Sequence, residues 1–530
     1  MQKDILERKW YLYLTEFFSG MALMAVELGA SRLIAPYFSS SQIVWTIIIG
    51  TIMIAMALGN VFGGRWADKD PDPSRLFRRI MIAAVWIAAI PLVGKYIIVA
   101  ITGVLIIAVD TNLLIWAAFL TCMILFVFPL FLLGTVTPSL IRATVSDLKE
   151  SGSIAGKLGA CNTIGSIIGT FVPTFVSIPA VGTSATFLIF SGILLAISLA
   201  YFIFRGGGKK AAAVSVILFV LCSLFGHTDH FAFWENGLTY EGESIYNYLQ
   251  VKEDDRQTVL STNVLFGVQS IRMKNEGLTG MYYDYALAAP VMAGKKDPKV
   301  LILGMGTGTY AAQLQRYFPE ADIVGVEIDE KITDLAHTYF DLDASIPVAT
   351  YDGRAYLNVD TEKYDVIMVD AYQDITIPFQ MSSVEFFTLV KDHLADDGVM
   401  VVNLNMFSAD ENNIASYLAD TISGVFPCVT TADVIGSTNR ELFASVNDSA
   451  KTGLLSNTDT LENAELKAMM TVVAGGLSTW ESENRILTDD QAPVELLGMQ
   501  TIDAIIKDEV GYYKNLYEEG GLGGLIAELA

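Results

Sequence analysis

Residues 300–308 read VLILGMGTG, and this stretch decides the fold of the C-terminal half of the chain. Four apolar residues typical of a buried strand run directly into three glycines at alternate positions. A second apolar stretch, residues 322–327, ends in Glu327. Glycines let a backbone approach a ligand closely, and a carboxylate at the tip of the next strand holds a ribose diol. A tight turn alone does not need three alternating glycines, so the two segments together predict a nucleoside site.

Strands and helices alternate around this loop. The expected strands are residues 300–303, 322–327, 347–350, 365–369 and 399–404, and the expected helices are about 309–317, 330–339 and 383–394. This order predicts a doubly wound parallel sheet, a Rossmann-like fold of the class I methyltransferase type. Short alternating stretches before it predict a small N-terminal β-meander, and residues 411–530 are expected to form further helices and an acidic tail.

Two more of the expected strands are followed by aspartates. Asp352, next to Gly353, comes after the third strand, and Asp370 ends the fourth. Ligands of such sheets bind beyond the carboxyl ends of the strands. Asp352 suits an acceptor for an adenine amino group, with a turn aspartate as the alternative. Asp370 is expected to be functional, because placing a charge at the tip of a buried strand costs free energy.

The first 226 of the 530 residues have a different character, since they read as long hydrophobic runs. The runs lie at about 11–35, 42–64, 80–108, 112–138, 158–179, 183–204 and 211–226. Most are long enough to cross ~30 Å of hydrocarbon as helices. The sequence therefore predicts an integral membrane protein, with a transmembrane helical domain of about seven spans at 1–229, the β-meander at 230–295, and a Rossmann-like catalytic domain with a C-terminal helical extension at 296–530.

Charge divides at the same boundary. The net charge is +5 up to residue 229 and −29 beyond it. A soluble region with this negative charge repels nucleic acid and attracts cations, including polyamines. The alternative is that the acidic residues only keep the protein soluble or adapt its surface to salt. The four cysteines and four histidines show no CxxC and no ligand spacing, which argues against a disulfide framework and a metal site.

The side of the membrane on which the catalytic domain lies is ambiguous. Seven spans, with the basic loops inside, put residues 230–530 outside the cell. An interfacial final run or a divided third run restores the cytoplasmic face, where a nucleoside donor is made, and we expect that face. Within the spans Glu16 and Glu27 share one helix face, and an internal salt bridge with Arg32 is favoured over a cation path.

Residues 250–405 resemble the spermidine synthase (aminopropyltransferase) family. The matching motifs are DRQ at 255–257, YYDYA at 282–286, the glycine loop, VEID at 326–329, Asp352-Gly353 and VDA at 369–371. The whole layout is similar to the transmembrane spermidine synthase-like proteins, as are ELGASRLIAPY at 27–37, DAYQDITIP at 370–378 and TDDQAPVE at 488–495.

The resemblance implies transfer of an aminopropyl group from decarboxylated S-adenosylmethionine to a small cationic amine, without a metal, by a homodimer. Asp370 is then the catalytic base. The implied donor-binding residues are Gly304, Gly306, Thr307, Gly308, Glu327, Asp352, Gly353 and Gln257. The implied amine-binding residues are Asp374, Asp284, Tyr282, Tyr283 and Tyr372.

Three departures from the family pattern bear on the donor and the amine. Thr307 stands where the family has an aspartate, Asp284 replaces a glutamate, and Asp370 is separated from Asp374 by three residues. Loss of the charge at Thr307 makes intact S-adenosylmethionine a credible donor, for methyl or aminocarboxypropyl transfer. A polyamine-binding or transport protein is the third alternative.

Overall fold

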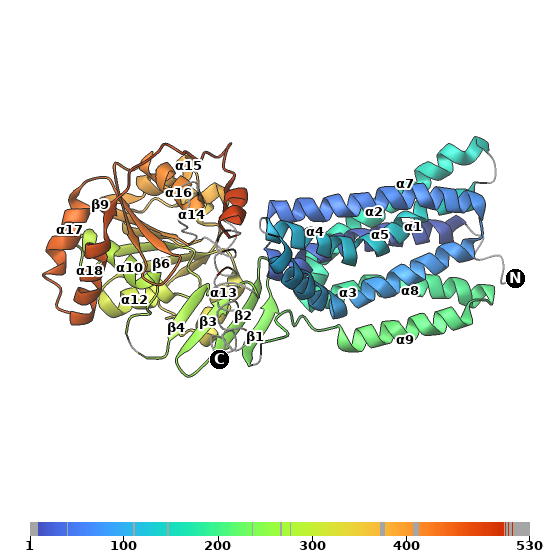
Figure 1. Ribbon diagram of the computed structural model, residues 1–530, viewed down its shortest axis with the longest axis horizontal. Helices are drawn as coiled ribbons and strands as arrows, with labels where there is room; N and C mark the ends of the chain where they lie inside the picture. Colours follow the sequence, from blue (N-terminus) through green and yellow to red (C-terminus); the bar gives the residue numbers. More distant parts are fainter. Residues whose placement is uncertain are drawn as a thin grey trace. The chain divides into compact units, whose positions relative to one another are not determined.

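The computed structural model of the protein describes residues 9–39, 41–109, 112–145, 148–235, 237–264, 268–275, 277–371, 377–405, 413–502, 504, 507 and 511 (Figure 1). The chain divides into two compact units. The helical unit comprises Met1–Trp234 and Glu241–Tyr248, and the second unit comprises Glu235–Tyr240 and Leu249–Ala530.

The helical unit is built from long apolar helices. They are α1 (Lys9–Phe38), α2 (Gln42–Lys69), α3 (Pro73–Ala108), α4 (Leu113–Leu125), α5 (Val127–Gly134), α6 (Val136–Thr144), the short η1 (Leu148–Glu150), α7 (Ser151–Val172), the π-helical η2 (Pro173–Ser177), α8 (Ile178–Arg205) and α9 (Lys209–Phe225). By length and composition, five described stretches are able to cross a membrane: Lys9–Phe38, Gln42–Lys69, Pro73–Ile106, Val127–Thr144 and Ser151–Arg205.

The last of these stretches corresponds to two of the expected runs. Gly182 has φ 82° and ψ 172°, so the helix is broken there. The new N-terminus is capped by two acids: the Thr183 N–H donates to Glu243 over 3.1 Å, and the Ser184 N–H donates to Asp229 over 2.8 Å. Carboxylates at this end of a helix satisfy its free N–H groups and favour its dipole.

The expected run at 112–138 is not one helix. It divides at Phe126 and Thr135 into α4, α5 and the start of α6. Pro129 and Pro138 give the physical reason, because proline is tolerated in the first turn of a helix and disrupts its interior.

Glu16 of α1 is buried, and its Oε1 accepts hydrogen bonds from Thr137 Oγ1 at 2.5 Å and Asn162 Nδ2 at 2.9 Å.

The second unit begins with the expected β-meander. Its sheet has the order β1 (Leu238–Glu243), β2 (Tyr248–Glu253), β3 (Gln257–Ser261) and β4 (Ser270–Met273). Two short helices follow, α10 (Tyr282–Ala286) and α11 (Ala288–Met292).

The central sheet has the order β12-β10-β11-β9-β8-β5-β6-β7. Its strands are β5 (Lys299–Leu303), β6 (Asp322–Glu327), β7 (Val348–Thr350), β8 (Tyr364–Val369), β9 (Leu394–Leu404), β10 (Cys428–Asp433), β11 (Arg440–Ser445) and β12 (Ser478–Thr479). Its helices are α12 (Thr309–Tyr317), α13 (Glu330–Tyr339), α14 (Gly353–Val359), the short η3 (Phe379–Met381), α15 (Val384–Asp392), α16 (Ile414–Ser423), α17 (Ser449–Thr458) and α18 (Ala464–Gly476).

The Rossmann-like prediction is confirmed for the half of the sheet from β7 to β9, where neighbouring strands are parallel. Beyond β9 the sheet is mixed, because β11 runs antiparallel to β9 and β10 runs antiparallel to β11. The further helices expected in 411–530 are present as α16, α17 and α18, but the strands β10 and β11 were not expected. Both strands are short and almost wholly buried, and such runs do not show the alternation that distinguishes a strand from a buried helix.

The core explains the continuous apolar runs of the parallel strands. Val300, Met368 and Val401 are fully buried, and they pack with apolar residues of the surrounding helices. Strands covered on both faces read as unbroken hydrophobic stretches. The polar residues that follow each stretch therefore mark the sheet edge.

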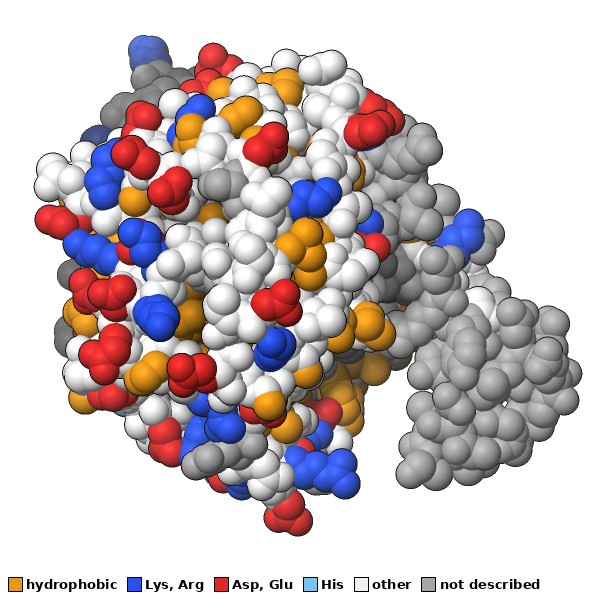
Figure 2. Space-filling view, turned by 90° about the vertical axis from the view of Figure 1, so that its left-hand side faces the viewer, with side chains coloured by type: hydrophobic (Ala, Val, Ile, Leu, Met, Phe, Trp, Pro, Cys, Tyr) orange, Lys and Arg blue, Asp and Glu red, His pale blue; other side chains and the backbone are white. Residues whose placement is uncertain are grey.

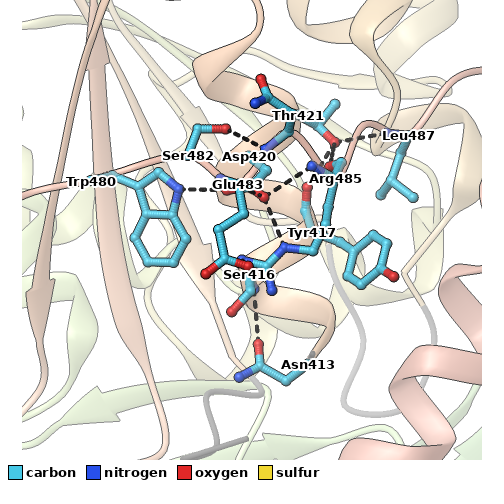
Figure 3. A network of polar contacts seen from close by, with 11 residues as sticks. Asn413, Ser416, Tyr417, Asp420, Thr421, Trp480, Ser482, Glu483, Arg485 and Leu487 are labelled. Atoms are coloured by element: carbon cyan, nitrogen blue, oxygen red, sulfur yellow. Dashed lines mark hydrogen bonds and ion pairs between the residues drawn. The ribbon is translucent and has the colours of Figure 1, made fainter. Parts of the chain in front are cut away.

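Residues 478–491, which we call the C-terminal strap, are fastened to α16 (Figure 3). Asp420 accepts hydrogen bonds from Trp480 Nε1 at 2.8 Å and from Arg485 Nε at 2.8 Å, as well as from the backbone N–H groups of residues 483 and 485. Farther along, Asp489 forms a two-pronged ion pair with Arg354 at 2.7 and 2.6 Å. The strap thus connects α16 to the first turn of α14.

Figure 2 shows the face of the second unit that carries α17 and α18. Acidic and basic side chains are interspersed over it. The acidic surplus of residues 230–530 is therefore not gathered into one patch on that face.

Candidate active site

The glycine loop lies against the end of the neighbouring strand β8. Gly304 has φ 88°, and a Cβ atom there would come within 2.6 Å of Ala371 N and Cα and of the Asp370 carbonyl carbon. Only glycine fits such an approach between two backbones. The loop is also held from the other side, since the N–H groups of residues 304 and 305 both donate to the Val326 carbonyl, at 2.9 and 3.0 Å. The packing fixes the loop beside Asp370.

Glu327 at the tip of β6 faces the same loop. Its Oε2 accepts a hydrogen bond from the Gly306 N–H at 2.9 Å, and its Oε1 accepts one from the Asp329 N–H at 3.1 Å. Only 7% of its surface is exposed, and burial raises the pKa of this carboxyl to about 7 against the effect of both hydrogen bonds. Each carboxylate oxygen has a second lone pair. Glu327 is therefore a positioned acceptor with capacity for the two hydroxyls of a ribose.

Asp352 acts as the N-cap of α14. Its Oδ1 accepts a hydrogen bond from the Ala355 N–H at 2.8 Å, and Gly353 opens the helix. The side chain is half-buried at the carboxyl end of β7. The cap is the structural role expected of a turn aspartate, and it leaves the residue at the edge where the nucleoside is expected.

Asp370 follows β8 and is held by two hydrogen bonds. Tyr282 Oη donates to its Oδ2 at 2.7 Å, and Asn403 Nδ2 donates to its Oδ1 at 3.2 Å. Burial raises the pKa of Asp370 to about 7, the negative charge of Glu327 adds to the rise, and the two hydrogen bonds oppose it. A carboxyl with a pKa near neutrality is suited to exchange a proton with a bound amine.

The two tyrosines before Asp370 have different partners. Their rings lie 4.0 Å apart, yet Tyr282 reaches Asp370 while Tyr283 Oη donates to the Gln269 carbonyl at 3.0 Å. Burial and the charge of Asp370 raise the pKa of Tyr282 far above its usual range, so its hydroxyl stays a donor. Tyr283 is thus a core aromatic within this structure.

Asp284 is occupied by its own loop. Its Oδ1 accepts from the Thr279 N–H at 2.9 Å and the Thr279 hydroxyl at 2.8 Å, and its Oδ2 accepts from the Gly280 N–H at 2.6 Å. Only 2% of Asp284 is exposed. These contacts give it a local structural role at the start of α10.

Thr307 lies between the glycine loop and the meander. Its N–H donates to Ser270 Oγ at 3.2 Å, and its own buried hydroxyl has no hydrogen-bond partner in the described chain. Thr307 and Gly308 also border a cavity of about 750 Å³ next to β4 and α12. That cavity is not lined by Asp370, Glu327 or Asp352, so we do not place the reaction there.

Gln257 lies on β3 of the meander, away from the contact between Thr307 and Ser270. It pairs with Met273, whereas Ser270 pairs with Leu260 three residues along β3. At ~3.3 Å per residue this separation is roughly 10 Å.

Two predicted amine ligands, Tyr372 and Asp374, lie outside the described residues.

The two amide side chains behind Asp370 were not predicted from the sequence. Asn403 near the end of β9 donates to Asp370, and Asn439 Nδ2 donates in turn to Asn403 Oδ1 at 2.8 Å. The signal for Asn403 is present in the sequence, since it is a polar residue inside the apolar stretch at 399–404. Asn439 shows no such signal, because it precedes a strand that was not predicted.

The geometry brings the principal predicted residues to one sheet edge. The glycine loop, Glu327 and Asp370 come from three adjacent strands, and the two carboxyls influence each other's charge. Two acids near each other favour a cationic ligand. The arrangement suits a nucleoside with a positive centre next to a protonatable partner. In the described residues, no group of three or more His, Cys, Asp or Glu residues is arranged to hold a metal ion.

Comparisons with known proteins give the family. The spermine/spermidine synthase domain matches residues 281–436. The chain is 54% identical over 345 residues to a probable polyamine aminopropyl transferase of Bifidobacterium longum, covering 62% of this chain and 77% of that protein. It is 26% identical over 301 residues to the polyamine aminopropyltransferase of Vibrio vulnificus, covering 53% of this chain and 98% of that protein.

Among solved structures, the chain is similar to the spermidine synthase of Thermotoga maritima. The sequence identity is 19% and the TM-score is 0.38, over 45% of this chain and 84% of that one.

Proposed function

This chain belongs to the polyamine aminopropyltransferase family, and from that premise we propose that it transfers an aminopropyl group from decarboxylated S-adenosylmethionine to an amine such as putrescine. Methylthioadenosine is the second product. The observation that carries the proposal is Asp370, held by Tyr282 and Asn403 at the tip of β8 and pressed against the glycine loop.

The reaction forms a C–N bond and breaks a C–S bond. The amine nitrogen attacks the carbon next to the sulfonium, and the bonding electron pair moves to sulfur, which leaves as a neutral thioether. The amine must first lose a proton, because free amines are protonated near pH 7. Asp370 accepts this proton, and the pKa of about 7 fits that task. Alignment of nitrogen, carbon and sulfur contributes up to ~7–11 kcal/mol.

The donor is bound by the other strands. In this proposal Glu327 accepts the ribose hydroxyls, the glycine loop lies along the nucleoside, and Asp352 lies at the adenine. The acidic pair Glu327 and Asp370 favours the sulfonium charge, which both possible donors share.

Thr307 supports a second candidate function. A neutral hydroxyl at this position cannot pair with the ammonium of an aminopropyl group as a carboxylate does. Intact S-adenosylmethionine is therefore the alternative donor, for methyl or aminocarboxypropyl transfer.

We further propose that the helical unit inserts into the lipid bilayer and that residues 249–502 lie on the cytoplasmic side, where the donor is made. The length and composition of the five apolar stretches support insertion. A homodimer formed through the catalytic domain is proposed from the family alone.

The decisive experiment supplies the purified full-length chain, in detergent or nanodiscs, with putrescine and either donor, and analyses the products by mass spectrometry. We expect methylthioadenosine and spermidine with the decarboxylated donor. S-Adenosylhomocysteine or a carboxylated amine product from the intact donor would establish the second candidate. Amine binding without turnover of either donor would establish a binding or transport protein instead.

Asp370→Asn is the matched test of the base. We expect kcat to fall by at least ~10²-fold while donor binding is retained, because the amide cannot take up the proton. Asp334→Asn, which removes an exposed acid on α13, is the control and should keep full activity. Full turnover by Asp370→Asn would overturn the assignment.

A further inference from the structure

Glu441 on β11 has an acidic side chain to which the contacts of the described residues assign no structural role. None of its surface is exposed, and neither of its oxygens has a hydrogen-bond partner in the described part of the chain. Burying a carboxyl without a partner is costly, and an apolar residue at such a place is usually at least as stable. Phe443, two residues farther along β11, and Val401, which pairs with it, belong to the apolar core. The packing of the second unit therefore does not account for Glu441.

The sheet places Glu441 in line with the catalytic carboxyl. Val369 of β8 pairs with Val402 of β9, which puts Asp370 beside Asn403, and Asn403 pairs with Glu441 of β11. Directly paired residues point to the same face of a sheet. Asp370, Asn403 and Glu441 thus form one row across three adjacent strands.

The row has a defined length and a polar middle. Neighbouring strands are about 4.8 Å apart, so the backbones of Asp370 and Glu441 are separated by roughly 10 Å. The amide of Asn403 lies between them and donates to Asp370. Helix α10, which brings Tyr282 to Asp370, also contacts β11. Burial raises the pKa of Glu441, and the negative charge of Asp370 raises it further.

Among the described residues of the amine side, no second carboxylate without partners has been identified, and Asp374, which the resemblance implies as an amine ligand, lies outside those residues. Thr307 is neutral, and the carboxylate of Asp284 is taken up by Thr279 and Gly280. A diamine carries a positive charge on each nitrogen, and only the reacting nitrogen is matched by Asp370.

We propose that Glu441 is the second carboxylate of the amine subsite and that it binds the non-reacting ammonium of a diamine acceptor. This inference rests on the proposed function. The bound ammonium supplies the hydrogen-bond donors that the fold does not provide, and the short methylene chain of the diamine passes along the row from Asp370 to Glu441. Glu441 thereby selects diamines over monoamines.

The test compares Glu441→Gln with the wild-type full-length chain. We expect the KM for putrescine to rise at least tenfold, the KM for the donor to stay unchanged, and the preference for putrescine over butylamine, which lacks the second ammonium, to be lost. Glu441→Asp keeps the charge and should retain part of that preference. Glu320→Gln, at an exposed position, is the matched control.

Thermal unfolding separates binding from structure. Without amine, Glu441→Gln should melt at the same temperature as the wild type or higher, because glutamine replaces a buried carboxyl that has no hydrogen-bond partner in the described residues, while the rise in Tm produced by putrescine should disappear. A lower Tm with an unchanged KM for putrescine would assign a purely structural role and overturn the inference.

The role of Glu441 and the transferase activity can be tested separately. If the wild type turns over neither donor, the proposed function is lost, yet the putrescine-dependent rise in Tm still tests Glu441. If the wild type makes spermidine and Glu441→Gln has a KM within twofold of it, the inference alone is wrong.

Discussion

Asp370 depends on its neighbours for its protonation state. Tyr282 donates to it over 2.7 Å, and that hydrogen bond favours the ionised form that accepts a proton. Burial acts in the opposite direction and raises the pKa to about 7. The balance predicts that the base is half ionised near neutral pH.

Tyr282→Phe tests this balance. Removing the hydrogen bond should raise the pKa of Asp370 further, so the rise of kcat/KM for putrescine should move to higher pH, by about one unit for each ~1.4 kcal/mol of lost interaction. The measurement is a pH profile of both proteins with saturating donor. The protonation of putrescine itself is common to both profiles, and Tyr339→Phe, which changes a partly buried tyrosine of α13 in another apolar cluster, is the control. An unchanged inflection would contradict the assigned role of Tyr282.

Single residues were predictable where they interrupt an apolar run. Glu327 and Asp370 end runs of buried residues, so their positions at the sheet edge follow from the sequence, and the structure brings both to the glycine loop. Glu441 was not predictable, because its significance lies in its pairing with Asn403 across two strands. Register between distant strands is a property of the folded sheet. Asp284 looked like an amine ligand until its contacts with Thr279 and Gly280 were visible.

The glycine loop connects backbone conformation to donor binding. Gly304 combines φ 88° with a separation of 2.6 Å between a would-be Cβ and the backbone of β8. Both conditions exclude a side chain.

Gly304→Ala is therefore expected to push the loop away from Asp370 and to weaken binding of the donor at least tenfold, measured by calorimetry, with a lower Tm. Gly475→Ala makes the matched control. It lies in α18 with open space around its Cβ position, and alanine should stabilise that helix by roughly 0.5–1 kcal/mol. Equal donor affinity in Gly304→Ala and the wild type would contradict this account of the loop.

The C-terminal strap is stabilised by one buried acid. Asp420 is fully buried and receives Arg485, whose side chain is 14% exposed, together with Trp480. Removing one partner of a buried ion pair leaves the other uncompensated, at a cost of ~3 kcal/mol or more.

Asp420→Ala should accordingly lower the Tm and open the strap to limited proteolysis between residues 478 and 487. Glu483→Gln is the control, because its exposed carboxylate contacts the same arginine at 3.4 Å and contributes little. A strap that resists the protease equally in Asp420→Ala would show that other contacts hold it.

Elements were predictable where one pattern dominates. The parallel strands and helices 309–317 and 330–339 agree with the structure because strand ends, glycines and apolar periodicity coincide there. The antiparallel strands β10 and β11 were missed because their buried runs carry no alternation. In the helical unit the hydrophobic run at 112–138 concealed two helix starts, and only the prolines at 129 and 138 indicate them.

At the level of the chain, charge and hydropathy separate two halves that the structure also separates into two units. We expect the protein to remain with membranes after alkaline extraction, since five stretches are long and apolar enough to insert. Protease added to sealed right-side-out vesicles should leave residues 249–502 intact and should cleave them in inverted vesicles. Cleavage in right-side-out vesicles would place the catalytic unit outside and would require an external source of the nucleoside donor.

The candidate site is built from two sets of strands in the central sheet. Nucleoside-facing groups come from β5, β6 and β7, whereas the row that ends at Glu441 runs over β8, β9 and β11. The two sets meet where β5 pairs with β8, and Gly304 lies against the end of β8 there. Changes along β11 can therefore alter the choice of acceptor amine without disturbing the donor-binding strands. Among relatives with different acceptors, we expect the sequence of β11 to vary and the glycine loop to stay the same.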